Sequence, residues 1–432
     1  MNYQKAKQYI QAAQTGAAIQ PGLETISLLL EWLHEPQEDC SFIHLAGTNG
    51  KGSTGTFLTN VLAKSGRKIG RYFSPALFSK NETIQWKQNE KTHLISQEEY
   101  ETYYITIARA VKKMEQQGQP IPTEFEIETA LAFLAFSKWN CDLVVLETGM
   151  GGALDATNVV KNVICNVITP IAKDHKKFLG DSLEEIARHK AGIITTKAPV
   201  VSSQENDEVW EIIANRCKIL GAPLYQLEKQ DITEISCGEG KTEFYFQGEK
   251  YEIQMCGHYQ IENACLALLT LQVIKPFFSI PKEEEKEAMF ASTWPGRFDF
   301  IRHDPVWIAD GAHNPDGLSS LLDSLNQMYS KKRWIGIMGV FRDKDYKKMC
   351  RQLAARGRFE TIVAIRPPGP RGLEAEKLAE ELKQNRLESF VCSSIPEAVE
   401  MAEKVQKKEK ESIVICFGSL SFMRELYQIV MK

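Results

Sequence analysis

The chain has 432 residues, of which 43% are hydrophobic and 25% are charged, so it can bury a large core and form two domains of ordinary size. Its formal net charge of -4 excludes a general electrostatic footprint for nucleic acid. The ten cysteines form no CxxC pair, no stretch approaches the roughly 20 apolar residues of a membrane span, and Met1–Gln14 lacks the apolar run of a signal peptide, so we expect a soluble, unprocessed protein of the reducing cytoplasm.

Short β-rich runs alternate with helical patterns through the first part of the chain. The first strand is predicted at Phe42–Ala46 and a helix follows at Thr54–Lys64, where Phe57 and Val61 share an apolar face. Three further strands are predicted at Leu143–Leu146, Val163–Ile168 and Val200–Val201. This alternation predicts a mostly parallel sheet flanked by helices.

A glycine-rich turn joins the first strand to the first helix. His44–Thr54 reads HLAGTNGKGST, and such turns cradle phosphates with backbone N–H groups at a helix N-terminus. We expect Lys51 to meet the β- and γ-phosphates, and a hydroxyl of Ser53 or Thr54 to lie close to the phosphates and their metal. The segment departs from the general G-x-x-x-x-G-K-[ST] pattern, because Leu45 takes the first glycine position and Gly52 follows the lysine. The alternative is a tight turn without a ligand, but strand, turn, lysine, hydroxyl and helix in this order favour a phosphate loop.

Three polar residues later in this part of the chain bear on a possible site. Glu147 ends the apolar run Leu143–Leu146, and a carboxylate at the carboxyl end of a parallel strand points toward the ligand crevice. Lys190 lies in the helical segment Leu183–Ile194, where a solvated lysine is the ordinary interpretation. Taken alone, His175 is a surface or hydrogen-bonding histidine. Each therefore needs further support before it can be assigned to a site.

The pattern changes to alternating, turn-punctuated segments at Thr242–Gln247 and Tyr251–Met255, which predict antiparallel hairpin strands. A charged run, Lys282–Lys286, follows, and we place a domain boundary near residue 295. The second part again alternates between the two kinds of element. Its strands are predicted at Val306–Ala309, Trp334–Met338, Thr361–Ile365 and Ser412–Phe417. Its helices are predicted at Gly317–Tyr329, Tyr346–Arg356, Glu374–Gln384 and Pro396–Lys408, which together describe a small doubly wound domain.

The segment Gly47–Ser53 resembles the ATP-binding loop of the folylpolyglutamate synthase and dihydrofolate synthase family, within the Mur ligase superfamily. Further segments resemble motifs of that family in the same order: Ser74-Pro75, Phe125-Glu126, Glu147–Gly152, Leu154–Asn158, Asp174-His175, Lys190–Ile193, Gly257–Gln260, Asn263-Ala264, Trp294–Arg297 and Asp310–Pro315. The resemblance implies an α/β protein: a P-loop-type central domain over residues 1–295, with a mostly parallel sheet, a small antiparallel sheet and the folate site. A smaller Rossmann-like glutamate ligase domain over residues 296–432 follows it.

The resemblance also implies roles for individual residues. The residues implied for ATP binding are Gly47, Thr48, Asn49, Gly50, Lys51, Gly52, Ser53, Asn263, Arg297, Asp310 and His313. The residues implied for catalysis are Lys51, His175 and Lys190. The implied ligands of two Mg²⁺ ions are Ser74, Glu147, His175 and, if it is carbamylated, Lys190. The residues implied for folate binding are Thr123, Phe125, Glu126, Leu154, Asp155 and Ala156.

Two of these positions have alternatives in the sequence itself. Phe125 alone would more often be a core residue, because the apolar helical run Ala130–Ala135 follows it. Asp310 alone would be a turn or helix-cap acid before Pro315.

The implied activity is the ATP-dependent addition of L-glutamate to a folate carboxylate through an acyl phosphate, by a monomer that binds small molecules and neither nucleic acid nor membranes. One alternative is another Mur-type ligase that acts on a UDP-linked cell-wall precursor. A second is a catalytically impaired nucleotide- or folate-binding paralogue. Ala76 and Ala153 depart from the family's usual histidine and arginine, which leaves dihydrofolate synthase activity open.

Overall fold

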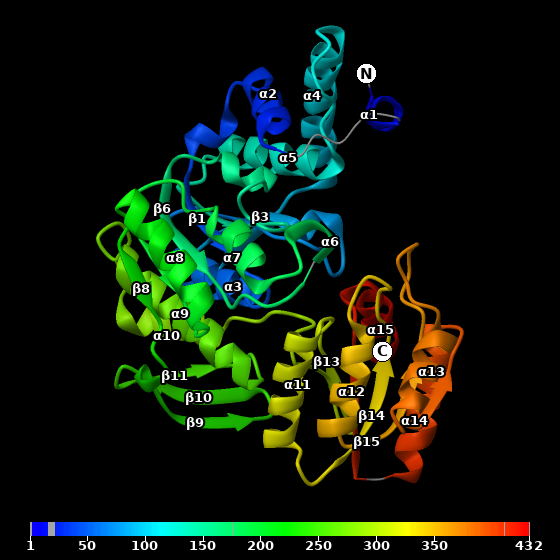
Figure 1. Cartoon of the computed structure of the whole chain (residues 1–432). Helices are drawn as coiled ribbons and strands as arrows, with labels where there is room; N and C mark the ends of the chain where they lie inside the picture. Colours follow the sequence, from blue (N-terminus) through cyan, green and yellow to red (C-terminus); the bar gives the residue numbers. More distant parts are fainter. Residues whose placement is uncertain (1, 16–21, 175, 410, 432) are drawn as a thin grey trace. The chain divides into compact units, whose positions relative to one another are not determined.

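The computed structural model describes residues 2–15, 22–174, 176–409 and 411–431. The described chain divides into two compact units (Figure 1). The first unit comprises Met1–Lys229 and Asn263–Met289, and the second comprises Gln230–Glu262 and Phe290–Lys432. The predicted hairpin strands therefore group with the second unit, whereas the domain boundary near residue 295 stays a prediction.

The first unit is built on an eight-stranded sheet with the order β4-β3-β2-β5-β1-β6-β7-β8. Its strands are β1 Ser41–Ala46, β2 Ile69–Tyr72, β3 Ile84–Gln88, β4 Lys91–Leu94, β5 Leu143–Glu147, β6 Val163–Ile168, β7 Val200–Ser202 and β8 Leu224–Gln226. All neighbours pair in parallel except β2 with β3 and β3 with β4, which form an antiparallel edge. The predicted α/β class with a mostly parallel sheet is confirmed.

Helices of this unit lie on both sides of the sheet. The helices in this part of the chain are α1 Tyr3–Gln14, α2 Glu24–Trp32, α3 Lys51–Ala63, α4 Gln97–Gln116, α5 Glu124–Lys138, α6 Lys176–Leu179, α7 Leu183–Ala191, α8 Asp207–Leu220, α9 His258–Ile274 and α10 Lys282–Phe290. The first residues of α9, up to Glu262, belong to the second unit. Buried residues of α2, α4 and α5 pack with Phe42, Tyr72 and Leu146 of the sheet. Because both faces are covered, β1 and β5 are apolar almost throughout.

The two faces of the sheet differ in the residues that they present. Ile43 pairs with Val145 and Val145 pairs with Arg71, so these three side chains share a face. Gly55 of α3 lies directly against Arg71, which places α3 on that face. His44 alternates with Ile43 and therefore points to the opposite face, toward the core that α5 covers. The phosphate loop and its neighbours thus sit where α3 meets the ends of β1, β2 and β5.

The second unit holds two sheets. The small antiparallel sheet consists of β9 Ile232–Gly238, β10 Lys241–Phe246 and β11 Glu249–Ile253. The larger sheet has the order β12-β13-β17-β14-β15-β16 and is parallel except for β12. Its strands are β12 Asp299–His303, β13 Val306–Ala309, β14 Arg333–Met338, β15 Phe359–Ala364, β16 Ser389–Val391 and β17 Ser412–Phe417. Its helices are α11 Pro315–Met328, α12 Tyr346–Arg356, α13 Ala375–Gln384, α14 Ile395–Lys408 and α15 Met423–Val430, so the predicted doubly wound arrangement is confirmed.

No helix within the described ranges combines the length and the hydropathy that a membrane span needs.

Candidate active site

The phosphate loop is shaped by two glycines with positive φ. Gly47 has φ 150° and Gly50, the N-cap of α3, has φ 92°. A Cβ at Gly47 would lie 1.8 Å from Thr169 Oγ1, and a Cβ at Gly50 would lie 2.3 Å from Asn263 Oδ1. Both positions therefore require glycine, for their backbone conformation and for their close neighbours. The second contact also places Asn263, predicted to bind ATP, directly beside the loop.

The loop is fixed to the segment that follows β6. Thr48 N donates to Pro170 O at 2.9 Å, and the Thr48 hydroxyl donates to Ala172 O and accepts from Ala172 N, both at 3.0 Å. Thr54 N donates to Gly50 O at 2.9 Å, which closes the first turn of α3. The N–H groups that precede Thr54 in this turn have no carbonyl partner inside the helix, which is the arrangement that binds phosphate.

Four charged side chains, Lys51, Arg71, Glu147 and Lys190, meet around this loop, and we call them the loop cluster. The Glu147 carboxylate is buried, 3.9 Å from Lys51 Nζ and 3.6 Å from Arg71 Nη2. Arg71 Nη2 also donates to Gly52 O at 2.9 Å. Burial lowers the pKa of Arg71 to about 10 while Glu147 opposes that shift, so the guanidinium stays charged near neutral pH.

Lys190 of α7 reaches into the same loop. Its Nζ donates to Gly47 O at 2.6 Å, and Lys51 Nζ donates to the same oxygen at 3.1 Å. Burial, and next the charge of Lys51, lower the pKa of Lys190 to about 7, against the attraction of Asp174 and Asp155. The ordinary interpretation of a solvated lysine is therefore wrong, because this side chain is almost fully buried beside the loop.

The sheet topology shows where the predicted metal ligands Ser74 and Glu147 lie. Ser74 comes two residues after the end of β2, and Tyr72 of β2 pairs with Leu146 of β5. Ser74 and Glu147 therefore belong to the same edge of the sheet. The predictions for His175 lie outside the described residues.

The residues predicted to bind folate gather at the start of α5 and in the segment after β5. Thr123 and Glu126 form a capping box, in which Thr123 N and Oγ1 donate to Glu126 Oε2 at 2.7 and 2.8 Å. The ring of Phe125 packs on Gly149, where a Cβ would lie 2.4 Å from its Cζ. Phe125 is half-buried and packs against the margin of the core. This position is compatible both with a core residue and with the predicted folate contact.

Asp155 of that segment is buried and accepts hydrogen bonds from Met150 N and Thr157. Burial raises its pKa. The neighbouring Leu154 is exposed and Ala156 is buried.

In the second unit, the remaining predicted ATP residues surround Asp310, which follows β13. The buried Asp310 carboxylate accepts from Tyr259 Oη at 2.5 Å, Phe298 N at 2.9 Å and Ala312 N at 2.7 Å. We call these groups, together with Arg297, the Asp310 cluster. A Cβ at Gly311 would lie 2.0 Å from Arg297 Nη1, and His313 Nδ1 lies 2.8 Å from Gly311 O. Burial raises the pKa of Asp310 although Arg297 and the hydrogen bonds oppose it.

Sequence reasoning missed Arg71 and Tyr259 as members of these clusters. The sequence does hold a signal for Arg71, since it is the one charged residue in the run Ile69–Tyr72, and a charge inside a buried strand needs a partner. Tyr259 lies within the Gly257–Gln260 motif but received no role from sequence.

Glu147 and Ser74, the described residues predicted to hold a metal without modification, suit a metal ion that takes few protein ligands. Within the described ranges, no group of three or more His, Cys, Asp or Glu side chains is placed to hold a metal ion. Mg²⁺ commonly takes one or two carboxylates and completes its shell with phosphate oxygens and water. Glu147 and Ser74 at one edge, beside a phosphate loop, fit that requirement.

Comparisons with known proteins cover nearly the whole chain. Residues 45–271 match the model of the Mur ligase middle domain, and residues 296–420 match that of the Mur ligase, glutamate ligase domain. The dihydrofolate synthase/folylpolyglutamate synthase of Bacillus subtilis is 31% identical, over 98% of this chain and 98% of that protein. The folylpolyglutamate synthase of Lacticaseibacillus casei is 32% identical, over 90% of each chain.

Solved structures agree with these matches. The Mycobacterium tuberculosis folylpolyglutamate synthase, complexed with ADP and AMPPCP, superposes with a TM-score of 0.87 at 28% identity, over 99% of both chains. A complex of FPGS with AMPPCP and folate superposes with a TM-score of 0.83 at 28% identity, over 100% of both chains.

Proposed function

Because the chain belongs to the folylpolyglutamate synthase and dihydrofolate synthase family of Mur ligases, we propose that the loop cluster carries out its phosphoryl transfer. The chain is an ATP-dependent ligase that joins glutamate to folate. The observation that carries the residue assignment is the glycine-shaped loop at the N-terminus of α3, with Lys51 and Glu147 3.9 Å apart beside it.

The ATP phosphates bind the N–H groups of Gly47–Ser53, and Lys51 moves from Gly47 O to the phosphoryl group as charge develops there. A carboxylate oxygen of folate attacks the γ-phosphorus, ADP leaves, and an acyl phosphate forms. The amino group of glutamate then attacks the carbonyl carbon, and phosphate departs with the oxygen that came from the carboxylate.

Mg²⁺ fits this site as a cofactor, with Glu147 and Ser74 as its protein ligands. When bound, it supplies positive charge to the phosphates during transfer. Arg71 orients Glu147, because the guanidinium of Arg71 contacts both the Glu147 carboxylate and Gly52 O.

A second metal ion fits if Lys190 is carbamylated. A pKa lowered to about 7 gives a substantial neutral fraction near neutral pH, and only the neutral amine reacts with carbon dioxide. The product is an anion with oxygen donors at a position now held by a cation. Intact-mass and peptide mass spectrometry under non-acidic conditions tests this, and an unmodified Lys190 in active enzyme would remove the second metal from the account.

Folate is assigned to Thr123, Phe125, Glu126 and Leu154–Ala156, where the half-buried Phe125 ring offers a stacking surface. In the second unit, Arg297, Asp310 and His313 are assigned to the nucleotide. We further propose that the protein works in the cytoplasm as a monomer and binds no nucleic acid. Light scattering during size-exclusion chromatography and an electrophoretic mobility-shift assay test the last two statements.

The test incubates purified protein with ATP, Mg²⁺ and labelled glutamate, and offers reduced folates, dihydropteroate or a UDP-linked cell-wall precursor in separate reactions. Mass identification of the products is expected to show glutamate added to the folates. Addition to dihydropteroate as well would make the enzyme bifunctional. Addition only to the UDP-linked precursor would overturn the folate assignment, and no addition anywhere would indicate an impaired paralogue.

A further inference from the structure

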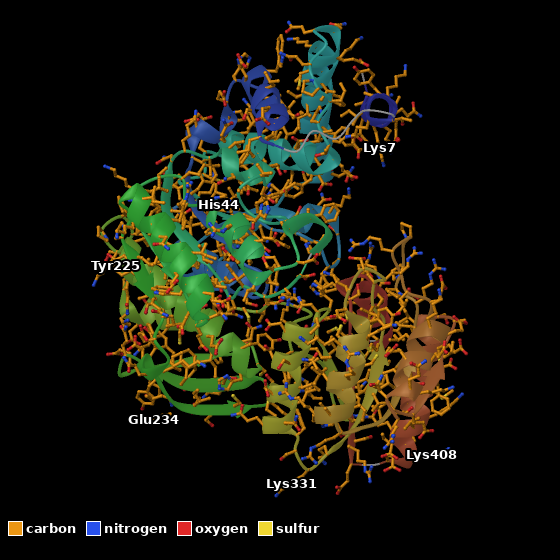
Figure 2. The ribbon with its side chains drawn as sticks, in the orientation of Figure 1. Lys7, His44, Tyr225, Glu234, Lys331 and Lys408 are labelled. Atoms are coloured by element: carbon orange, nitrogen blue, oxygen red, sulfur yellow. The ribbon has the colours of Figure 1, made fainter. Side chains whose placement is uncertain are left out.

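His44 is a fully buried polar residue in the middle of the parallel sheet. It lies in β1, 0% exposed, and Figure 2 marks it in the first unit. Its side chain points to the face opposite α3 and the loop cluster. The ring atom Nε2 lies 2.9 Å from Thr157 Oγ1.

The proton on that hydrogen bond can be assigned. The Thr157 hydroxyl donates to Asp155 Oδ1 at 2.6 Å, and a hydroxyl has one proton to give. Thr157 Oγ1 must therefore accept from His44, so Nε2 carries the proton and Nδ1 does not. Burial lowers the pKa of His44 to about 3, which keeps the ring neutral and this tautomer fixed near neutral pH.

These hydrogen bonds lead from His44 through Thr157 to the carboxylate of Asp155. This carboxylate has one hydrogen-bond acceptor position left. Asp155 Oδ1 accepts from Thr157 N at 3.1 Å and from Thr157 Oγ1, and Oδ2 accepts from Met150 N at 2.7 Å. An ionised carboxylate offers about four acceptor positions, so one position on Oδ2 remains for a ligand N–H. Asp155 itself is only 5% exposed, whereas Met150, which donates to it, and the adjacent Leu154 are 39% and 53% exposed, so the carboxylate lies beneath a segment at the surface.

We propose that His44 is a positioning residue that, through Thr157, fixes the Asp155 carboxylate so that its remaining acceptor position receives the 2-amino group of the folate ring. This inference rests on the proposed function, because it takes Asp155 as a folate contact. The relay His44–Thr157–Asp155 lies within the first unit and needs no contribution from the second.

The geometry distinguishes this role from simple core packing. Phe42 of the same strand and Leu146, the register partner of His44, are apolar residues on that face. A leucine at position 44 would suit such surroundings without a buried polar group that must find a partner. Among the described residues Nδ1 of the ring has no hydrogen-bond partner, so the single hydrogen bond of this buried imidazole is the one from Nε2 to Thr157, which continues to the Asp155 carboxylate.

The test compares the binding of folate with that of 2-desaminofolate, which lacks the amino group, by titration calorimetry of the full chain. Wild-type protein is expected to prefer folate by about 10- to 100-fold, as for a hydrogen bond to a charged group. His44→Leu and Thr157→Val are expected to reduce this preference to within about threefold. His44→Gln, which can place an N–H near the position of Nε2, and Thr157→Ser are expected to keep it. ATP affinity serves as a control and stays within about twofold in all four.

Asp155→Asn separates the positioning role of His44 from the folate contact of Asp155. If Asp155→Asn removes the preference for the amino group but His44→Leu and Thr157→Val keep it, the relay is wrong and the folate assignment of Asp155 stands. If Asp155→Asn also keeps the preference, the folate assignment of Asp155 fails and the inference fails with it. If His44→Leu does not fold, Thr157→Val decides, since threonine and valine have nearly the same shape. Equal loss in His44→Gln and His44→Leu would also overturn the relay.

Discussion

Two buried carboxylates, Glu147 in the loop cluster and Asp310 in the Asp310 cluster, are held in different ways. Glu147 faces the cations of Lys51 and Arg71 at 3.9 and 3.6 Å, beyond the usual length of a direct hydrogen bond. Asp310 accepts three hydrogen bonds of 2.5–2.9 Å, two of them from backbone N–H groups. Side-chain cations can rearrange around a metal ion and phosphate, whereas backbone donors cannot. We therefore expect the loop cluster to adapt to a changing charge and the Asp310 cluster to keep a fixed geometry.

The largest expected effect is a loss of unfolding free energy when the ion pair between Arg71 and Glu147 is broken. Arg71→Met leaves Glu147 without its buried guanidinium, and such a loss costs about 3–5 kcal/mol of unfolding free energy. Urea unfolding measures this loss. Arg67→Met is the matched control, because Arg67 is exposed and the one contact described for its side chain is with the Phe278 ring, 4.5 Å away. A loss no larger than that of the control would show that Arg71 does not support Glu147.

The next effect concerns catalysis. Lys51→Met removes the cation that follows the developing charge, and the expected loss in kcat is about 10²- to 10³-fold with little change in the KM for folate. Steady-state kinetics of ADP release measures it. Lys64→Met, at the other end of α3, removes a lysine that pairs with Glu90 and Glu287 and is expected to stay near wild-type activity. Equal rates in the two variants would remove Lys51 from the mechanism.

The Asp310 cluster is expected to respond in stability rather than in rate. Tyr259→Phe deletes one hydrogen bond to a charged group, which costs about 1.5–3 kcal/mol. Thermal and urea unfolding should show this loss while kcat changes less than in Lys51→Met. Tyr225→Phe, at an exposed position in β8, is the control. A large fall in kcat with unchanged stability would contradict the division between the two clusters.

The smallest expected effect is a gain of unfolding free energy, on replacing Lys190. The folded-state pKa of Lys190 is about 7, below its value in the unfolded chain, so the unfolded state binds more protons between pH 7 and about pH 10. The free-energy cost of keeping a protonated Lys190 buried in the folded state is therefore full below pH 7, and it decreases as the pH rises toward about 10. Lys190→Met, in buffer free of carbon dioxide, is therefore expected to gain on the order of 1 kcal/mol at pH 6.5, after the loss of the hydrogen bond to Gly47 O is counted. A gain that grows toward pH 10 would contradict this account.

Sequence reasoning succeeded where the signal is local. The loop between β1 and α3 was predicted because strand, glycines, lysine and helix follow one another in the chain. The predicted start of the helix at Thr54 was late by one turn, since α3 begins at Lys51. An apolar face shows where a helix packs, whereas its first turn is decided here by Gly50 and its positive φ.

The rest depends on contacts between distant segments. Arg71 finds room in the sheet because Gly55 of α3 leaves space for its guanidinium, and no local pattern announces such a pair. The edge strands β3 and β4 were also missed, since their pairing with β2 continues the sheet beyond the predicted parallel strands. The capping box of Thr123 and Glu126, in contrast, was readable as T-x-x-E before an apolar run, but the resemblance drew attention to folate instead.

The most direct test of the central claim follows one oxygen atom. Folate labelled with ¹⁸O in its side-chain carboxylates is incubated with the protein, ATP, Mg²⁺ and glutamate, and the released phosphate is analysed by mass spectrometry. Phosphoryl transfer at the loop cluster predicts one ¹⁸O atom in each phosphate, together with ADP and a glutamate-extended folate. Unlabelled phosphate, or AMP in place of ADP, would contradict the acyl-phosphate route.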